Sequence, residues 1–327
     1  MCGFLVVGSS ELELQVFNDA LNQAAYRGPD HQHVSINNGI TWGFNRLSIM
    51  DLSSKGNQPF VYKDCVLVCN GEVYNYHSLK AMLETDYTFK SGSDCEVLIP
   101  LYHKYGIEIL CKFLDAEFAM VIYDAKKDKI LAARDPMGIR PMFYGYHKED
   151  GKICFASEAK GLFPLCQEIM PFPPGHYYED GKFICYNDLS NPKTINNDDL
   201  ETIATNLRLK LEKAVEKRLQ SDAPIGYLLS GGLDSSLVCA IAARLNDQPI
   251  KTFAIGMDTD PIDLKYAKQV ADYLGTDHTE VIMTKEDLLE NLRDVIFHLE
   301  TYDITTIRAS MATVSYTHLT LPTTSRV

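Results

Sequence analysis

The sequence begins Met1-Cys2-Gly3-Phe4-Leu5-Val6-Val7, so a cysteine directly follows the initiator methionine and precedes a short apolar run. That run predicts a buried β-strand with Cys2 at its start. If Met1 is removed, Cys2 carries both a thiol and a free α-amine. An α-amine titrates at pH ~8 and can take the proton of the neighbouring thiol, so one residue supplies nucleophile and base. A cysteine at position two can also be incidental, so this interpretation requires oxyanion donors and substrate-binding groups elsewhere in the chain.

Length and composition are those of a globular protein with room for two domains. The chain has 327 residues, of which 46% are hydrophobic and 23% charged, and its net charge is −13. The acidic balance, without a dense basic run, argues against nucleic acid or an anionic membrane as a partner. The nine scattered cysteines form no C-x-x-C pair, which favours free thiols and a cytoplasmic location. We expect neither a signal peptide nor a membrane-spanning helix, since no apolar run approaches ~20 residues.

The first region mixes strands and helices without strict alternation, which predicts antiparallel sheets with helices packed on them. The stretch Pro171-Phe172-Pro173-Pro174-Gly175-His176 predicts a stiff turn, and the polar residues that follow it predict a domain boundary. We expect a first domain over 1–187 and a linker over 188–199. The apolar patterns predict strands at 4–7, 32–36, 40–45, 66–69, 118–123, 130–134, 144–146 and 153–156, and helices at 12–25, 76–84 and 94–105.

The second region, expected over 200–312, alternates strands and helices after a first helix, which is typical of a parallel, doubly wound sheet. The final stretch, 313–327, has no helix caps, no periodicity and no further strand. We interpret it as a non-native tail joined to a truncated gene, with a native disordered tail as the alternative. The patterns predict helices at 200–219, 235–245, 263–274 and 285–300, and strands at 225–229, 251–255 and 278–282.

The loop Ser230-Gly231-Gly232-Leu233-Asp234-Ser235-Ser236 lies between an expected strand and an expected helix. Backbone N–H groups in such a turn point into one concavity, and the helix N-terminus adds partial positive charge, which suits pyrophosphate. No lysine closes the loop, so it is not a Walker A motif. Asp234 is expected to orient Mg²⁺ or the loop itself. The alternative is a plain strand–turn–helix connection with a serine N-cap.

These motifs resemble those of known families. The loop 230–236 looks like the pyrophosphate loop of ATP pyrophosphatases, which cleave ATP between its α and β phosphates. The two regions, in this order, resemble the glutamine-hydrolysing asparagine synthetase family, and the stretches 253–257 and 300–310 strengthen the match. The motifs that resemble the glutaminase of class II glutamine amidotransferases are Cys2-Gly3, Arg27-Gly28-Pro29-Asp30, Arg46-Leu47-Ser48, Asn70-Gly71-Glu72 and Ser91-Gly92-Ser93-Asp94.

The resemblance implies an α+β N-terminal-nucleophile fold, an αββα sandwich, followed by an α/β parallel-sheet domain of the adenine nucleotide α-hydrolase-like kind, here truncated. It also implies that Cys2 attacks the amide of glutamine and releases ammonia through a thioester. The side chain of Asn70 and the backbone N–H of Gly71 would then form the oxyanion hole. Arg27 and Asp30 are expected to shape the loop over Cys2.

The expected glutamine site contains one cation and two carboxylates. Arg46 would bind the α-carboxylate as a bidentate fork, and Glu72 and Asp94 would bind the ammonium group. Leu47 and Ile49 complete this implied set. The alternatives are a surface cation for Arg46, a turn residue for Glu72 and a helix N-cap for Asp94. A separate pair, Arg134 and Asp135, is expected to be structural.

In the second region the resemblance implies ATP as a substrate, with Mg²⁺ held in part by Asp234. Leu228 and Ile255 match positions that flank the nucleotide, although both also suit the core of a sheet. Aspartate would attack the α-phosphate to give aspartyl-AMP, and ammonia would displace AMP to give asparagine, the reaction of a carbon–nitrogen ligase. The implied nucleotide-binding residues are Leu228, Ser230, Gly231, Gly232, Asp234, Ser235 and Ile255.

The sequence departs from the family pattern at its end. A second loop, S-G-E-G-S-D-E, is expected beyond Ser310 and is missing, so we expect this chain to hydrolyse glutamine at best and to form no asparagine. The shortened sheet should leave an unpaired edge. Three other functions remain open: an amidotransferase with a different acceptor, a β-lactam-type synthetase and a non-catalytic glutamine or nucleotide sensor. A homodimer is the assembly we consider.

Overall fold

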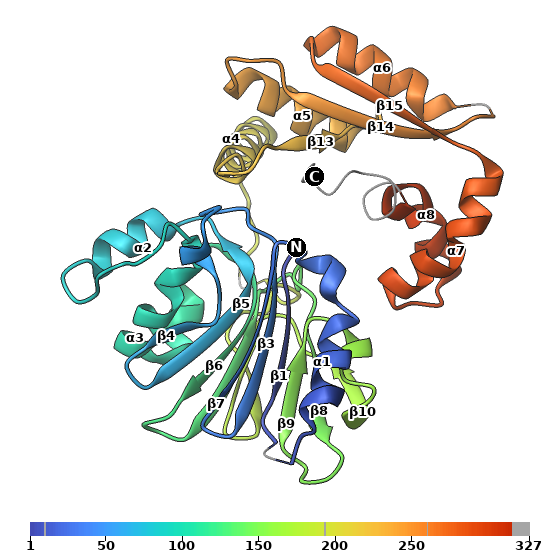
Figure 1. Ribbon diagram of the computed structural model, residues 1–327. Coiled ribbons are helices and arrows are strands. Elements are labelled where there is room, and N and C mark those ends of the chain that lie inside the picture. The colour runs from blue at the N-terminus through green and yellow to red at the C-terminus, as the bar shows by residue number, and fades with distance from the viewer. Residues whose placement is uncertain (10, 193, 260, 316–327) are drawn as a thin grey trace. The chain divides into compact units, whose positions relative to one another are not determined.

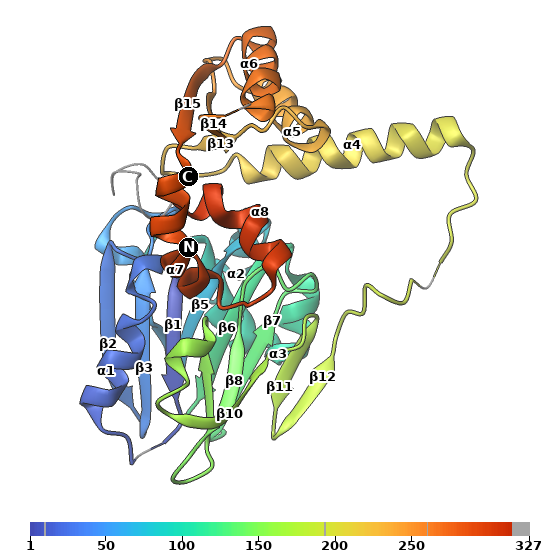
Figure 2. The ribbon, with the colours of Figure 1, turned by 90° about the vertical axis from the view of Figure 1, so that its right-hand side faces the viewer.

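The computed structural model describes residues 1–9, 11–192, 194–259 and 261–315, and the chain divides into two units, Met1–Ile195 and Asn196–Val327 (Figure 1). Each unit is described by itself. Figure 2 shows the described residues between the last strand of the first unit and the first helix of the second as an extended segment. The predicted tail over 313–327 lies outside the described residues from position 316 onward.

Twelve strands of the first unit form two six-stranded sheets. Those strands are β1 (Gly3–Val7), β2 (His31–Asn37), β3 (Ile40–Arg46), β4 (Phe60–Tyr62), β5 (Cys65–Val73), β6 (Ala116–Asp124), β7 (Lys129–Arg134), β8 (Phe143–His147), β9 (Ile153–Ala156), β10 (Cys166–Pro171), β11 (His176–Glu179) and β12 (Lys182–Cys185). One sheet has the order β10-β8-β9-β1-β3-β2 and the other β12-β11-β7-β6-β5-β4. Neighbouring strands within each sheet pair antiparallel.

Three layers of apolar contact make this unit an αββα sandwich, as predicted. Helix α1 (Leu14–Asn22) packs on the outer face of the first sheet, where Phe17 and Leu21 join one buried cluster. Helices α2 (Tyr76–Leu83) and α3 (Leu98–Phe113) cover the second sheet. A third cluster lies between the sheets and includes Phe4 and Trp42.

Strand β1 is buried on both faces, which explains its uninterrupted apolar sequence. Phe4 and Val6 belong to the cluster between the sheets, whereas Leu5 and Val7 belong to the cluster beneath α1. Successive side chains of a strand point to opposite faces, so four apolar residues in a row suit a strand covered on both sides. The position of Cys2, directly before this strand, is fixed by the same packing.

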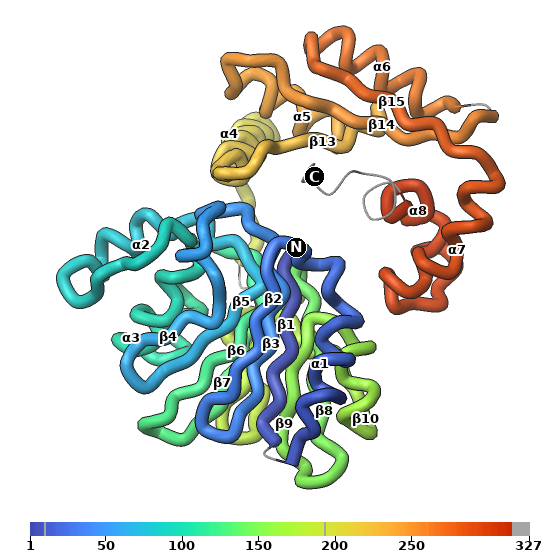
Figure 3. Tube along the Cα trace, in the orientation of Figure 1, coloured from blue at the N-terminus to red at the C-terminus, as the bar shows by residue number. Residues whose placement is uncertain are grey.

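The second unit contains a parallel sheet of order β13-β14-β15, as its alternating sequence predicts. Figure 3 follows this alternation along the Cα trace. The connecting helices follow each strand in turn, so the loop after β13 lies at the carboxyl end of the sheet. The elements are α4 (Leu200–Arg218), β13 (Gly226–Leu228), α5 (Leu233–Leu245), β14 (Lys251–Met257), α6 (Ile262–Leu274), β15 (Asp277–Met283), α7 (Lys285–Leu299) and α8 (Ile304–Val314).

Several elements differ from the sequence prediction. The strand predicted over 66–69 continues to Val73, and the helix predicted over 94–105 begins as a 3-10 turn, η3 (Asp94–Val97). The helix predicted over 12–25 ends at Asn22 and is followed by the 3-10 turn η1 (Ala25–Arg27). Strands β4, β10, β11 and β12 and helix α8 were not predicted. Much of β10 and β12 is exposed, so these strands lack an apolar signal of their own.

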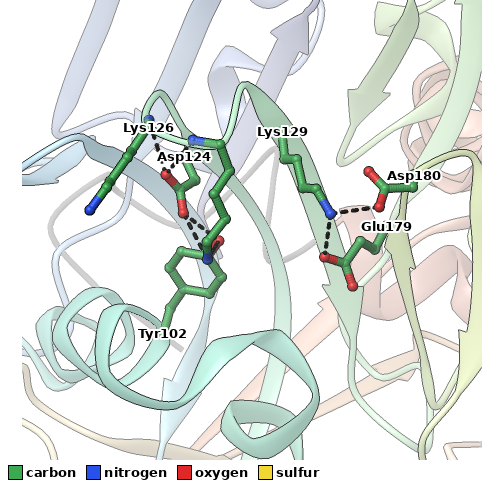
Figure 4. Close-up of polar contacts among 7 residues, drawn as sticks. Tyr102, Asp124, Lys126, Lys129, Glu179 and Asp180 are labelled. Carbon is green, nitrogen blue, oxygen red and sulfur yellow. Dashed lines mark hydrogen bonds and ion pairs between the residues drawn. The ribbon is translucent and has the colours of Figure 1, made fainter.

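A buried carboxylate fixes the turn between β6 and β7 (Figure 4). Asp124 accepts hydrogen bonds from the hydroxyl of Tyr102 at 2.9 Å and from the backbone N–H groups of Lys126 and Lys127 at 3.1 and 3.2 Å. The ammonium group of Lys127 also lies 3.1 Å from the carboxylate. Burial favours a raised pKa for Asp124, but the hydrogen bonds from Lys127 and Tyr102 outweigh burial and lower the pKa.

We predict that Asp124→Ala lowers the free energy of unfolding by ~2–3 kcal/mol at pH 7, since it leaves several donors without their acceptor. Lys126→Ala is the control, because Lys126 is exposed and contributes only its backbone N–H; its effect should stay within ~0.5 kcal/mol. The folded pKa of Asp124 lies below the unfolded value of ~3.9, so its contribution is present above that value and is lost as the pH falls through the folded pKa. Denaturant unfolding of both variants between pH 7 and pH 2 measures this. A difference from wild type that stays constant over that range would contradict the prediction.

Candidate active site

The thiol of Cys2 is held by the segment that follows β3. Cys2 is partly buried against the cluster between the sheets. Its S–H donates to the carbonyl of Leu47 at 3.5 Å, and the N–H of Leu47 donates to Sγ at 3.4 Å. Burial raises the pKa of the Cys2 thiol, so formation of the thiolate requires a base.

Arg27 and Asp30 shape the surroundings of Cys2, as predicted. The Nε–H of Arg27 donates to the carbonyl of Cys2 at 2.9 Å, and its Nη1 forms a buried ion pair with Glu158 at 2.9 Å. Asp30 accepts a hydrogen bond from the N–H of Ser48 at 2.7 Å. These contacts attach the turn after α1 to the start of β1 and to the segment after β3.

Strand β5 continues past the end of its neighbour β4, so the backbone N–H groups on that edge of β5 have no partner strand after Leu67. The side chain of Gln58 bonds both the N–H and the carbonyl of Cys69, at 2.7 and 3.0 Å, and Val73 donates its N–H to Asp94 at 2.6 Å. Successive N–H groups in a strand point to opposite sides. The N–H of Gly71 therefore faces the same edge, between these two capped positions.

Asn70 projects from β5 into the space between the two sheets. It lies on the same face of the strand as Val66 and Val68, which belong to the cluster that contains Phe4 of β1. Asn70 is 1% exposed, and its Nδ2 has no hydrogen-bond partner among the described residues. Buried polar groups are nearly always paired, so the Nδ2 group of Asn70 is suited to donate a hydrogen bond to an oxygen atom of a ligand.

Arg46 is buried, not the surface cation of the alternative interpretation. Its Nη1 donates to the carbonyl of Ser53 at 2.6 Å and to Oδ1 of Asn57 at 2.7 Å. Its Nη2 donates to the carbonyls of Met50, at 3.3 Å, and Asp51. Arg46 thus organises the loop over residues 50–57, and its predicted contact with a substrate carboxylate stays a prediction.

The loop that Arg46 organises is joined to the loop before η3. Asp51 accepts a hydrogen bond from the N–H of Gly92 at 2.8 Å. The buried Glu96 accepts hydrogen bonds from the N–H groups of Lys90 and Ser91 at 2.9 and 2.8 Å. Ile49, predicted as a substrate residue, lies partly buried at the start of the first loop. Both loops therefore stand at the end of the sandwich where β5 presents Gly71.

Two carboxylates occupy this end of β5. Glu72 lies within the strand, not in a turn, and burial together with nearby Asp94 raises its pKa. Asp94 is 4% exposed, and burial raises its pKa as well. Its carboxylate bonds the N–H of Val73 across the gap, so Asp94 is not simply a cap of its own helix. Two carboxylates in one buried site favour the binding of a cation.

Arg140 is a residue of this region that the sequence reasoning missed. It is buried, and its Nη2 lies 3.7 Å from Oε2 of Glu117 on β6. Its charge influences Cys2 and Glu72. No periodicity or short spacing signals this arrangement, because the ion pair joins segments that only the folded sheet brings together. The preceding Arg134 and Asp135 bond backbone groups of the turn, as predicted.

In the second unit the predicted phosphate loop connects β13 to α5. The hydroxyl of Ser235 accepts a hydrogen bond from the N–H of Ser230 at 3.2 Å and lies 3.0 Å from the Ser230 hydroxyl. Gly231 has φ +76°, and a Cβ there would lie 2.5 Å from backbone atoms of Tyr266 and Ala267. Only glycine fits this position, where the loop crosses α6. The N-terminus of α5 begins directly after Gly232.

The other predicted nucleotide residues lie on β13, on the neighbouring strand β14 and in the first turn of α5. Leu228 ends β13 and is 40% exposed, so it is not wholly a core residue. Ile255 lies in β14 and is partly buried, and Asp234 is exposed in the first turn of α5. Within the described ranges, no group of three or more His, Cys, Asp and Glu side chains is arranged to hold a metal ion. A single carboxylate fits Mg²⁺ that is held mainly by phosphates.

Comparison with known proteins identifies relatives of both units. Residues 1–175 match the glutamine amidotransferase domain family, and residues 206–320 match asparagine synthase. A probable glutamine-hydrolysing asparagine synthetase of Schizosaccharomyces pombe is 41% identical over 95% of this chain and 60% of its own length. Asparagine synthetase B of Escherichia coli is 42% identical over 87% of this chain and 54% of its own length. The chain thus spans little more than half the length of these curated relatives.

A solved structure described as the allosteric regulatory enzyme of purine biosynthesis superposes with a TM-score of 0.50 at 15% identity. The match covers 87% of this chain and 80% of that one, and it shows likeness of fold alone. The similarity to glutamine-hydrolysing asparagine synthetases extends over both units. Because the first family model covers more than half of its residues, the chain belongs to the glutamine amidotransferase domain family.

Proposed function

We propose that the first unit hydrolyses the side-chain amide of glutamine, with Cys2 as the nucleophile. One observation carries the proposal: the buried Nδ2 of Asn70 on β5 has no hydrogen-bond partner within the described part of the chain, and it lies opposite β1, the strand that follows Cys2. The Gly71 N–H at the same end of β5 supplies a second donor. A tetrahedral oxyanion formed by attack on an amide requires such donors at ~3 Å.

The reaction proceeds through a thioester. The α-amine takes the thiol proton, Sγ bonds to the amide carbon, and the C–N bond breaks as the amine returns the proton to departing ammonia. Water then attacks the thioester to give glutamate and restores the thiol. The described chain includes Met1, whose α-amine has its pKa lowered to about 5 by burial, with Arg27 and Arg140 acting in the same direction. Removal of Met1 would place the free α-amine on Cys2 itself, where it can act as the base.

Glutamine would be oriented by its α-ammonium and α-carboxylate groups. Glu72 and Asp94 lie near each other, with their pKa values raised to about 8 and about 6, so an ammonium group placed between them would favour their ionised forms. Arg46, with the loop that it organises and the nearby Leu47 and Ile49, would receive the carboxylate. Burial of these groups favours recognition of a free amino acid, because both charged ends must be matched.

This chain spans little more than half the length of its curated relatives. A protein of the relatives' full length would pass the ammonia to an activated carboxylate. The names of the relatives support aspartate as the acceptor and asparagine as the product. The loop 230–236 would bind the pyrophosphate part of ATP at the N-terminus of α5. Mg²⁺, when bound, would neutralise charge on the departing phosphates, and Asp234 would contribute one oxygen ligand.

The cellular setting follows from the cysteines. All nine are free, and eight of them are at least partly buried, which supports a reducing cytoplasm. No helix among the described residues has the length and apolarity of a membrane span. We further propose that neither nucleic acid nor a membrane is a partner, given the acidic net charge, and that a homodimer is the assembly.

We predict that Cys2→Ala abolishes ammonia release from glutamine, whereas Cys185→Ala, which removes an exposed cysteine, leaves the rate unchanged. Asn70→Ala should lower kcat by ~10²–10³-fold with a smaller change in KM, because its amide contacts the oxyanion of the transition state. Coupled detection of glutamate and ammonia measures both constants, and far-UV circular dichroism checks folding. Release that persists in folded Cys2→Ala would exclude Cys2 as the nucleophile.

We also predict that active chains lack Met1. With Met1 retained, the nitrogen of Cys2 is an amide and cannot accept the thiol proton. Intact-mass spectrometry on fractions of different specific activity relates ammonia release to the removal of Met1. An active sample that is fully Met1-retaining would refute the role of the amine.

For the second unit, we predict that Gly231→Ala weakens binding of ATP by at least ~10-fold, because the added Cβ would displace the loop from α6. Gly275→Ala is a matched control: its φ is also positive, at +67°, but a Cβ there meets no atom within 4 Å. Isothermal titration of ATP with Mg²⁺ into each variant provides the comparison. Equal weakening in both variants would point to general destabilisation, not to the loop.

A further inference from the structure

Arg140 is held in place by a turn that clamps its backbone. Its N–H donates to Oδ2 of Asp135 at 3.1 Å, and its carbonyl accepts from Nε of Arg134 at 2.8 Å. The same Asp135 carboxylate accepts the N–H groups of Met137 and Ile139, each at 3.0 Å. Because the backbone is fixed on both sides, the side chain leaves the turn in a defined direction.

The guanidinium of Arg140 is buried and only partly satisfied. Arg140 is 7% exposed, and its Nη2 lies 3.7 Å from Oε2 of Glu117. Its Nε is buried without a hydrogen-bond partner within the described part of the chain. A fully structural arginine would normally engage its donors as Arg46 and Arg134 do. The incomplete bonding of Arg140 indicates that its charge, more than its hydrogen bonds, matters at this position.

The sheet register explains why a cation is required here. Glu72 of β5 lies directly opposite Glu117 of β6, and both side chains face the space between the sheets. Like charges directly opposite each other on neighbouring strands destabilise a sheet. Arg140 approaches this pair from the turn after β7 and supplies the opposite charge.

The charge of Arg140 also reaches the reacting groups. The charged and titratable groups around it are Glu117 on β6, Glu72 on β5, Asp94 on η3, Arg27 on η1, and the thiol of Cys2 with the α-amine before β1. Burial and then Asp94 raise the pKa of Glu72, and Arg140 opposes them. The charge of Arg140 thus favours the ionised form of Glu72, although burial and Asp94 together raise its pKa to about 8.

We propose that Arg140 is a positioning residue for glutamine hydrolysis: paired with Glu117, its buried charge balances the facing carboxylates of Glu117 and Glu72, so that Glu72 can receive the ammonium group of the substrate. The inference rests on the function proposed above for Cys2. It assigns Glu117 a matching role, which is to hold Arg140 and to moderate its charge. Arg140 and Glu117 therefore shift the pKa of Glu72 in opposite directions, Arg140 downward and Glu117 upward.

The test is the pH dependence of kcat/KM for ammonia release from glutamine, measured on the full chain. We predict that Arg140→Met moves the acid limb of the profile upward by about one pH unit, which is a loss of roughly tenfold below that limb. Arg140→Lys, which retains the charge, should return the limb toward its wild-type position. Glu117→Gln removes a negative charge, so its acid limb should move downward.

The opposite shifts distinguish an electrostatic role from a structural one. A merely structural role would lower activity in both variants without moving either limb, and that result would overturn the proposal. If Arg140→Met does not fold, the Glu117→Gln variant tests the proposal alone. An acid limb of Glu117→Gln that stays in place or moves upward would overturn the proposal. Lys129→Met is the matched control: Lys129 also pairs with carboxylates, at 2.6 and 3.2 Å, but it lies roughly 23 Å along β6 from Glu117.

The control should leave the limb unchanged, and a shift there would show that the profile reports stability and not the site. Cys2→Ala separates this inference from the proposed function. Absence of Cys2-dependent ammonia release in the wild-type chain would remove the function itself. Cys2-dependent release whose pH profile does not respond to Arg140 would remove only the role of Arg140.

Discussion

Burial of β1 on both faces is the constraint on which the candidate active site depends. Phe4 and Val6 pack between the sheets while Leu5 and Val7 pack beneath α1, so the strand cannot rotate or slide without exposing one of the two sets. Cys2, directly before this strand, is therefore held at one end of the sandwich. The peptide of Leu47 then fixes the thiol from both its N–H and its carbonyl. A reactive chain terminus, ordinarily mobile, is positioned by the core of the fold.

The same end of the sandwich is built from interrupted sheet pairing. Strand β4 ends its pairing with β5 at Leu67, and from there the edge of β5 is capped by side chains. Gln58 takes the groups of Cys69, and Asp94 takes the N–H of Val73. Gly71, between them, faces the gap. An edge that is usually a liability thus becomes a place where a backbone donor is available to a ligand.

The sequence predicts most of this fold, but not the contacts that the candidate site residues make. Antiparallel sheets with packed helices, the parallel second sheet and the phosphate loop follow from apolar periodicity and from Gly-rich turns, which are local signals, whereas the αββα arrangement was implied by the family resemblance. The end of β5 was misjudged because Asn70-Gly71-Glu72 breaks the apolar pattern of the strand, although the partner strand continues the pairing. The predicted contact of Arg46 with a substrate carboxylate stays a prediction, but no sequence pattern indicated that both its terminal nitrogens bond carbonyls of the following loop. Arg140 was missed entirely, since its effect depends on the register of β5 against β6.

The buried charges of this site are best understood as one balanced group. Glu72, Asp94 and Glu117 would repel one another if all were ionised in a buried place without a cation. Arg140 offsets one of these charges at all times, because an arginine does not lose its proton in this pH range. The remaining deficit can be met by the ammonium group of a substrate. A site that lacks one positive charge when empty is selective for a cationic group of the right size. A bound ammonium group would also oppose protonation of the nearby α-amine, because two positive charges would then lie close together. Substrate binding would therefore help to keep the base unprotonated.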